Sequence, residues 1–214
     1  MSSVREIELT CPICFCTFVS RTVVPGSLLS MRTDFHERTK GPQPLPYLVH
    51  TCSKCGYSGP AKVFSSEATL GPDVREHVWD ELAPRLPTTP LTGSEKYEFA
   101  AKVAMWQGAE PQHVADAFLR AAWCCVDERD FEAERYFRRY AVWGFENALE
   151  SHQIACEERA MFTYLVGELW RRIGDVKRAR QWFDRVPSEI TNAEDEKWIL
   201  DAARHQRDHP REWF

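Results

Sequence analysis

The sequence predicts a mainly α-helical protein in which a small β-rich head precedes an array of antiparallel helical hairpins. Three observations indicate this fold class. Two CxxC pairs lie within the first 55 residues, apolar residues recur at three- and four-residue spacing after residue 70, and one later stretch has the residue pattern of a helical hairpin. At 214 residues the chain is long enough to bury a sizeable core as one domain or two.

The composition is that of an ordinary globular protein, with 43% hydrophobic and 28% charged residues. No apolar run reaches the roughly eighteen residues of a membrane-spanning helix, and the first residues lack the apolar stretch of a secretory signal. We therefore expect a cytoplasmic protein. Because thiols are kept reduced in that compartment, eight cysteines favour metal ligands or buried thiols over disulfides.

The net charge of −5 hides an asymmetry. Residues 1–66 contain seven Lys and Arg against four Asp and Glu, whereas residues 67–214 contain 20 against 28. This balance does not favour strong nucleic-acid binding by the whole chain, although it leaves room for a local contact through the basic head.

Short strands are expected in the head at residues 19–24, 47–51 and 62–64, which are rich in β-branched and aromatic side chains. Between the first two, residues 40–46 contain three prolines, which remove backbone donors. An extended surface loop is expected there.

The two cysteine pairs are Cys11-Pro-Ile-Cys14 and Cys52-Ser-Lys-Cys55. A tetrahedral Zn²⁺ needs four soft anionic ligands a few ångströms apart, and each CxxC turn supplies two of them. Gly56 suits the positive φ angle that such a turn often needs, whereas Phe15 holds the matching place in the first turn and indicates a less regular one. Because four thiolates leave no open position for a catalytic metal, one structural Zn²⁺ is predicted at Cys11, Cys14, Cys52 and Cys55.

The 37 residues between the pairs exceed the about 15–20 of a compact zinc ribbon, so a long excursion must loop out and return. Three side chains near the pairs are alternative or additional ligands: Cys16, His36 and His50. Cys16 is expected instead to be a small, buried, apolar side chain. The two histidines are expected at the surface or along a strand. A redox dithiol at the first pair lacks the expected βαβ context.

Helices are expected at residues 72–85, 94–107, 111–127, 130–150, 157–173, 175–186 and 193–207. Ser94 is expected as an N-cap followed by Glu95, Pro111 as a first helical residue, and Asp130 and Asp175 as N-caps. Residues 85–91 contain two prolines and are expected to form a turn or linker.

Residues 163–183 have the pattern of a tetratricopeptide hairpin. In this pattern Gly167 lets the two helices approach closely, Trp170 fills the next layer, and Gly174-Asp175 form the turn. Ala179 and Phe183 of the second helix then pack against the first helix. A weaker copy runs through residues 122–134, and the two turns lie 45 residues apart instead of about 34. These features predict a zinc-ribbon-like domain at residues 1–66, a connecting helix and linker at 67–92, and a degenerate tetratricopeptide-like helical domain at 93–214.

The residues also resemble a bacterial family of unknown function. The resemblance is carried by Cys11-Pro-Ile-Cys14, Arg32-Thr-Asp-Phe35, Pro44-Leu-Pro-Tyr47, Cys52-Ser-Lys-Cys-Gly-Tyr57, Leu119-Arg-Ala-Ala-Trp123 and Asp130-Phe-Glu-Ala-Glu134. It implies a zinc-ribbon head followed by helical hairpins and covers most of the chain. The sequence departs from the family's pattern at Phe15, where glycine is more typical.

Six tryptophans fall on the expected helices at spacings that suit a core: Trp106, Trp123, Trp143, Trp170, Trp182 and Trp198. By analogy with helical repeats, the first helix of the clear hairpin is expected to line a partner-binding groove with Tyr164, Glu168, Arg171 and Arg172. The two arginines would clamp a partner's carboxylate, although arginines near a helix C-terminus also simply favour the helix dipole.

The preferred function is therefore a zinc-stabilised scaffold that binds a protein or peptide. An alternative is nucleic-acid binding by the head, where basic residues (Arg21, Arg32, Arg38, Lys40, Lys54 and Lys62) interleave with aromatic ones (Phe18, Phe35, Tyr47 and Tyr57). A further alternative is a redox-sensitive zinc protein. No catalytic residues are predicted, because phosphate-loop, HExxH, GxSxG and dinucleotide motifs are all missing. The polar cluster of Asp34, His36 and Glu37 suits a surface loop better than acid–base catalysis.

Overall fold

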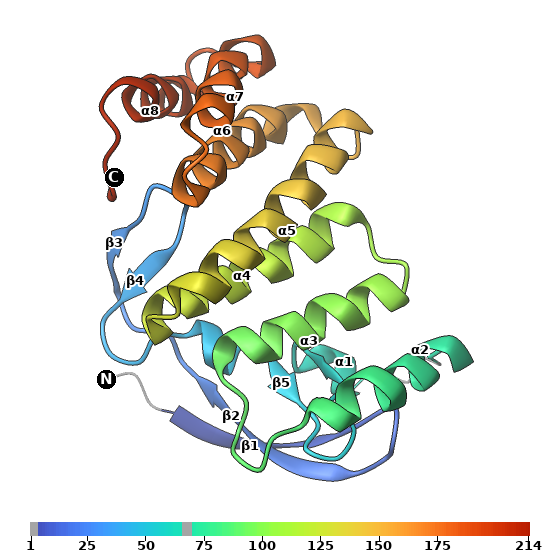
Figure 1. Cartoon of the computed structure of the whole chain (residues 1–214). Coiled ribbons are helices and arrows are strands. Elements are labelled where there is room, and N and C mark those ends of the chain that lie inside the picture. Colours follow the sequence, from blue (N-terminus) through green and yellow to red (C-terminus); the bar gives the residue numbers. More distant parts are fainter. Residues whose placement is uncertain (1–3, 66–69) are drawn as a thin grey trace.

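The head is built from three two-stranded antiparallel sheets in a computed structural model that describes residues 4–65 and 70–214 (Figure 1). Strand β1 (Val4–Thr10) pairs with β2 (Thr17–Val23), β3 (Leu28–Met31) with β4 (Glu37–Thr39), and β5 (His50–Thr51) with β6 (Ser58–Gly59). A short 3₁₀ helix, Leu45–Tyr47, follows β4, and the four-residue helix α1 (Lys62–Ser65) follows β6.

Helices make up most of the described chain after the head. Helix α2 (Pro72–His77) continues through a π turn (Val78–Leu82) and a 3₁₀ turn (Ala83–Arg85). The larger helices are α3 (Gly93–Trp106), α4 (Pro111–Glu128), α5 (Phe131–Glu150), α6 (Cys156–Ile173), α7 (Val176–Glu189) and α8 (Lys197–Asp208). No helix among the described residues is long and apolar enough to cross a membrane.

The predicted mainly helical fold with a small strand-containing head is confirmed. The predicted helices match closely, and Asp130 and Asp175 cap α5 and α7 by accepting the amide N–H groups of Ala133 and Arg178, each at 3.0 Å. The N-cap of α3 is Thr92 instead of Ser94, because Thr92 and Glu95 form a reciprocal capping box.

The head shares its core with the first helices. Phe18, Tyr57 and Phe64 form a cluster of edge-on rings that continues into Val78 and Leu82 of the π turn and Phe99 of α3, all buried. The end of the chain that carries the two CxxC pairs is therefore packed against the helical body over a common apolar surface.

A second core lies between α4, α5 and α6. Helices α4 and α5 run side by side through the middle of the molecule, and α6 packs on α5 beside α7 (Figure 1). Gly144 permits the closest approach of α4 and α5, since a Cβ there would lie 2.7 Å from the Cβ of Ala115. Gly167 does the same for α6 and α7, where a Cβ would lie 2.7 Å from the Phe183 ring. The predicted hairpin with Ala179 and Phe183 packed against α6 is present.

Several local predictions are wrong. Residues 62–64 begin helix α1 instead of forming a strand, because Phe64 turns inward onto the rings of Phe18 and Tyr57. Helix α7 runs through Pro187 to Glu189 rather than ending at 186. Among the six tryptophans, Trp182 is buried and Trp143 is 64% exposed. Trp198 is also exposed, so not every helical tryptophan belongs to the core.

Candidate metal centre

The two CxxC segments fold into turns with the same backbone pattern. In the first, the Phe15 N–H donates to the Cys11 carbonyl at 2.9 Å and the Cys11 N–H to the Cys16 carbonyl at 3.0 Å. In the second, the Gly56 N–H donates to the Cys52 carbonyl at 2.9 Å and the Cys52 N–H to the Tyr57 carbonyl at 2.9 Å. Both turns therefore present two sulfurs to the same side.

The residue after each pair has a left-handed backbone, with φ of 56° at Phe15 and 81° at Gly56. The expectation of a less regular first turn is corrected, since its hydrogen bonds match those of the second. Phe15 reaches this conformation at a steric cost of about 1 kcal/mol, because its Cβ crowds the backbone where glycine would not. Its exposed ring lies 5.5 Å from the Arg75 guanidinium.

The structure brings the four predicted sulfurs together from two distant parts of the chain. The ligand atoms of Cys11, Cys14, Cys52 and Cys55 all lie within 4.8 Å of one another. Two of the sulfur pairs, Cys11–Cys55 and Cys14–Cys52, are each 3.5 Å apart. Three of the four residues are fully buried and Cys14 is partly exposed, so the cluster lies at the edge of the head's core.

Four thiols this close cannot all ionise without a cation. The pKa of Cys52 is lowered by hydrogen bonds from the Cys11 and Cys55 thiols. The pKa values of Cys11 and Cys55 are raised, mainly because each thiol donates a hydrogen bond to the sulfur of a neighbouring cysteine. A divalent cation reverses this balance by stabilising every thiolate at once.

The geometry fits a tetrahedral metal. Zn–S bonds of about 2.3 Å place neighbouring sulfurs roughly 3.8 Å apart, close to the observed 3.5 Å pairs. Backbone N–H groups of Ile13 and Cys14 approach the Cys11 sulfur, and those of Lys54 and Cys55 approach the Cys52 sulfur. Such N–H groups stabilise thiolates. The cluster is thus compatible with Zn²⁺, held by four soft ligands.

The other candidate ligands lie elsewhere. Cys16 directs its thiol to the Thr17 carbonyl at 3.4 Å, and the Nδ1 atom of His50 lies 2.8 Å from the Ser20 hydroxyl. His36 stacks on the Trp123 ring, and burial lowers the pKa of His36 to about 4. Within the described residues the metal-competent group consists of the four cysteines alone.

A pair of substitutions tests the two turns. We expect Gly56→Ala to lower the free energy of unfolding by about 2–4 kcal/mol, because the added Cβ meets left-handed strain and overpacking. That Cβ would lie 2.8 Å from the Leu82 Cβ. Phe15→Gly is expected to stay within about 1 kcal/mol of wild type or to stabilise, since it removes strain and only an exposed ring contact. Urea unfolding of the metal-loaded protein measures both. Equal destabilisation by the two substitutions would contradict this account.

The four residues expected to line an exposed groove lie on α6 under other parts of the chain. Tyr164 and Glu168 are fully buried, and Arg172 nearly so. The Tyr164 hydroxyl donates to the Thr33 carbonyl at 2.9 Å, and Arg171 and Arg172 both bind the Glu168 carboxylate at 2.7 Å. The expectation of an open surface at Tyr164, Glu168, Arg171 and Arg172 is therefore corrected, because the β3–β4 segment and the tail cover them.

Asp34 lies at the centre of this buried polar network. Its carboxylate is 2.8 Å from the Arg138 guanidinium and 3.6 Å from those of Arg32 and Arg172. Burial alone would raise the pKa of Asp34, but the three arginine charges hold it well below its usual range. The sequence suggested a surface position for Asp34, and the one signal of its importance was its place in the Arg32-Thr-Asp-Phe35 run.

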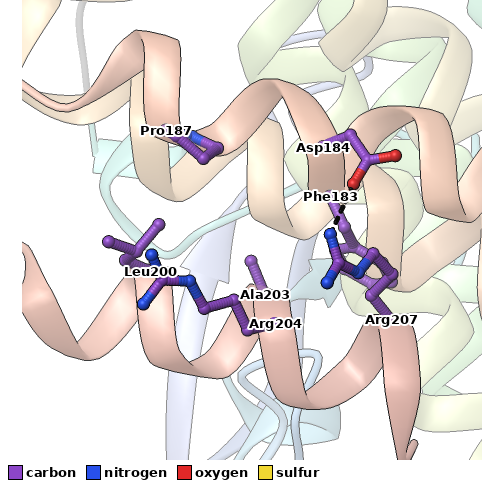
Figure 2. A pocket seen from close by; sticks show the side chains of 7 residues that line it. All are labelled: Phe183, Asp184, Pro187, Leu200, Ala203, Arg204 and Arg207. Atoms are coloured by element: carbon purple, nitrogen blue, oxygen red, sulfur yellow. Dashed lines mark hydrogen bonds and ion pairs between the residues drawn. The ribbon is translucent and has the colours of Figure 1, made fainter.

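A small cleft of about 220 Å³ lies between α7 and α8 (Figure 2). The Arg207 guanidinium points across it to the Asp184 carboxylate at 2.9 Å and also binds Asp208 at 3.0 Å. Arg204, the other arginine in its lining, lies 3.8 Å from Asp201. Because both guanidinium groups already pair with carboxylates, the arginines of this cleft are poorly suited to bind an anionic ligand.

A family model described as "Uncharacterized protein conserved in bacteria (DUF2225)" matches residues 5–209. Comparisons with curated proteins and with solved structures give no match. The family match spans both the cysteine cluster and the helices, as the sequence resemblance implied. The chain therefore belongs to this bacterial DUF2225 family.

Proposed function

We propose that this protein is a scaffold, stabilised by one structural Zn²⁺, that binds an amphipathic helix of a partner protein. The proposal rests on one observation, an apolar groove of about 660 Å³ on the face formed by the end of α3 with α4 and α5. Its lining consists of Met105, Ala109, Pro111, Val114, Ala115, Phe118, Arg139, Tyr140, Trp143 and Gly144.

The groove has a floor of small residues and walls of large ones. Ala115 and Gly144 meet at the floor, where the two helices approach most closely. Met105 and Trp143 stand on the walls with 52% and 64% of their surface exposed. Contiguous exposed apolar surface of this kind, rimmed by polar residues, is typical of a binding site.

A helix suits this groove better than an extended strand does. The groove lies between packed helices whose backbone groups are already hydrogen-bonded, so it offers a partner side-chain pockets and no free strand edge. Arg139 lines it and forms no ion pair with any described residue. The partner helix is therefore expected to carry an acidic residue beside its apolar face.

The metal centre contributes by fixing α3. Gly56, directly after the second cysteine pair, lies against Leu82 and the Phe99 ring of α3. The same helix ends at Trp106, one residue beyond the groove residue Met105. Zn²⁺ bound at the cluster would thus hold one wall of the groove in place.

Replacing Trp143 tests the proposal. We expect Trp143→Ser to lose partner binding by about tenfold or more, because large aromatic side chains that become buried in an interface often carry much of its binding free energy. Phe131→Ser is the matched control, since Phe131 is equally exposed on the same helix but outside the groove lining. Both variants and wild type would be used for affinity capture from the native host, followed by cross-linking to identify the bound segment.

Two outcomes would reject the groove as the binding site. One is a partner that Trp143→Ser retains as well as Phe131→Ser does. The other is a cross-linked segment that has no apolar helical face. Unchanged circular dichroism of both variants would exclude unfolding as the cause of any loss.

The alternatives have less support. Phe18 and Tyr57, two of the aromatic residues considered for base stacking, are part of the head's core. Arg32 and Arg38 pair with Asp34 and Asp127, which reduces the basic surface available to phosphate. Redox sensing has one supporting feature: Cys14 is partly exposed, so an oxidant could reach its sulfur, whereas the other three cysteines of the cluster are buried.

A further inference from the structure

The segment Arg211–Phe214 lies alongside the end of β3, as the neighbouring positions of the C label and β3 in Figure 1 indicate. Arg32 and Trp213 form an antiparallel bridge. The Thr33 N–H donates to the Glu212 carbonyl and the Phe214 N–H to the Met31 carbonyl, both at 3.1 Å. The tail thus adds an antiparallel strand that forms hydrogen bonds with the backbone of the β3–β4 segment.

The Glu212 side chain enters a site made of two arginines. Its Oε2 atom lies 3.1 Å from both the Arg32 Nη2 and the Arg172 Nη1 atoms. Arg172 also donates to the Glu212 carbonyl at 3.4 Å. These charges lower the pKa of Glu212 although its partial burial alone would raise it, so the site favours a carboxylate.

The two aromatic residues that follow have their own contacts. The Phe214 ring stacks on Phe35 with centroids 5.9 Å apart and approaches Tyr164 and Trp198. Trp213 lies under the Arg32 guanidinium at 5.7 Å. An acidic residue followed by two aromatic ones is therefore the pattern that this surface accepts.

Charge balance explains why an acidic residue is needed. The network beneath the tail contains four arginines, Arg32, Arg138, Arg171 and Arg172. Its own carboxylates are three, on Asp34, Glu134 and Glu168. Glu212 supplies the fourth negative charge, and a site without it would keep one uncompensated guanidinium.

The tail is held at the surface while the site beneath it is buried. Glu212, Trp213 and Phe214 keep 39–55% of their surface exposed, whereas Thr33, Asp34 and Glu168 are 0–1% exposed. Several hydrogen bonds hold this segment, but a short, partly exposed end of a chain opens at a lower free-energy cost than the buried core beneath it.

We infer that this surface is a peptide-binding site which the chain's own tail occupies in cis. Its ligand is an extended peptide with an acidic residue followed by two aromatic residues, added antiparallel to β3. A partner segment of that pattern must displace the tail, so competition from the tail raises the concentration of partner needed for binding. The site is separate from the α3–α5 groove and does not depend on the function proposed for it.

A labelled peptide tests the inference. Its sequence is that of residues 208–214, Asp-His-Pro-Arg-Glu-Trp-Phe, carrying fluorescein at the N-terminus and an amide at the C-terminus. A second peptide has Lys in place of Glu. Fluorescence anisotropy measures their binding to the wild-type chain, to Phe214→Ala, and to the double variant Glu212→Lys with Phe214→Ala, in which the tail loses its ion pairs and its ring contact.

The Glu peptide is expected to bind the double variant at least about tenfold more tightly than wild type, because the cis tail competes at an effective concentration near the millimolar range. Phe214→Ala is expected to be intermediate, which preserves a test if the double variant folds poorly. The Lys peptide is expected to bind the double variant at least about tenfold more weakly than the Glu peptide. Absence of Glu-peptide binding to both variants, or equal binding of the two peptides, would overturn the inference.

Discussion

The Cys52→Ser variant is expected to bind no Zn²⁺ at the proposed site and to lose on the order of 5 kcal/mol or more of the unfolding free energy of the head. Cys52 is fully buried, and its sulfur lies 3.5 Å from that of Cys14. A serine hydroxyl is a poor zinc ligand at neutral pH, and the metal's binding energy is folding energy for the residues around it. Elemental analysis after dialysis gives the zinc content, and thermal unfolding followed by circular dichroism gives the stability.

The control for this experiment is Cys156→Ser, which removes an exposed thiol at the start of α6, far from the cluster in sequence. It should retain one Zn²⁺ per chain and the wild-type melting curve. In Cys52→Ser the helical signal should largely persist at low temperature, because the core between α4, α5 and α6 contains none of the four cysteines. Full zinc occupancy in Cys52→Ser would refute the assignment of the ligands.

The second large effect is expected for Asp34→Ala, which should lower the free energy of unfolding by about 3–5 kcal/mol. The side chains of Asp34 and Arg138 are both 0% exposed, so removing the carboxylate leaves a buried guanidinium without its nearest partner. Breaking a buried pair from one side is costly, because the remaining charge keeps its desolvation penalty. Urea denaturation monitored by tryptophan fluorescence measures the change.

The matched control is Asp201→Ala on α8, where Asp201 and Arg204 are 58% and 62% exposed and 3.8 Å apart. Solvent screens such a pair, so a change below about 0.5 kcal/mol is expected. A similarly small effect for Asp34→Ala would mean that water or local rearrangement compensates the Arg138 charge, contrary to the burial described above.

Local sequence features predicted most of the helices and their capping. Apolar spacing gave the helix positions within a few residues, and side-chain chemistry identified Asp130 and Asp175 as N-caps. These features involve residues only three or four positions apart, so they can be recognised from the sequence alone. The strands were harder to predict. Strands β1, β3, β4 and β6 were not predicted, because their pairing partners are set by contacts between distant residues and not by local spacing.

The cysteine cluster was predictable despite 37 intervening residues, because the chemistry of one metal ion demands four similar ligands. The sequence could not show which polar residues would be buried. Tyr164, Glu168 and Arg172 have the pattern of a solvent-facing helix surface, yet residues about 130 positions earlier and about 40 positions later cover them.

The sequence by itself thus determined most of the helices, the N-caps Asp130 and Asp175, and the group of four cysteines, since each follows from local spacing or from the coordination number of one ion. Only the tertiary structure decided that Asp34 is buried among arginines, that Trp143 lies in an open groove, and that the tail adds a strand beside β3. The physical reason is that burial is a property of which distant segments meet. Desolvation and charge pairing then act on whichever side chains lie between them.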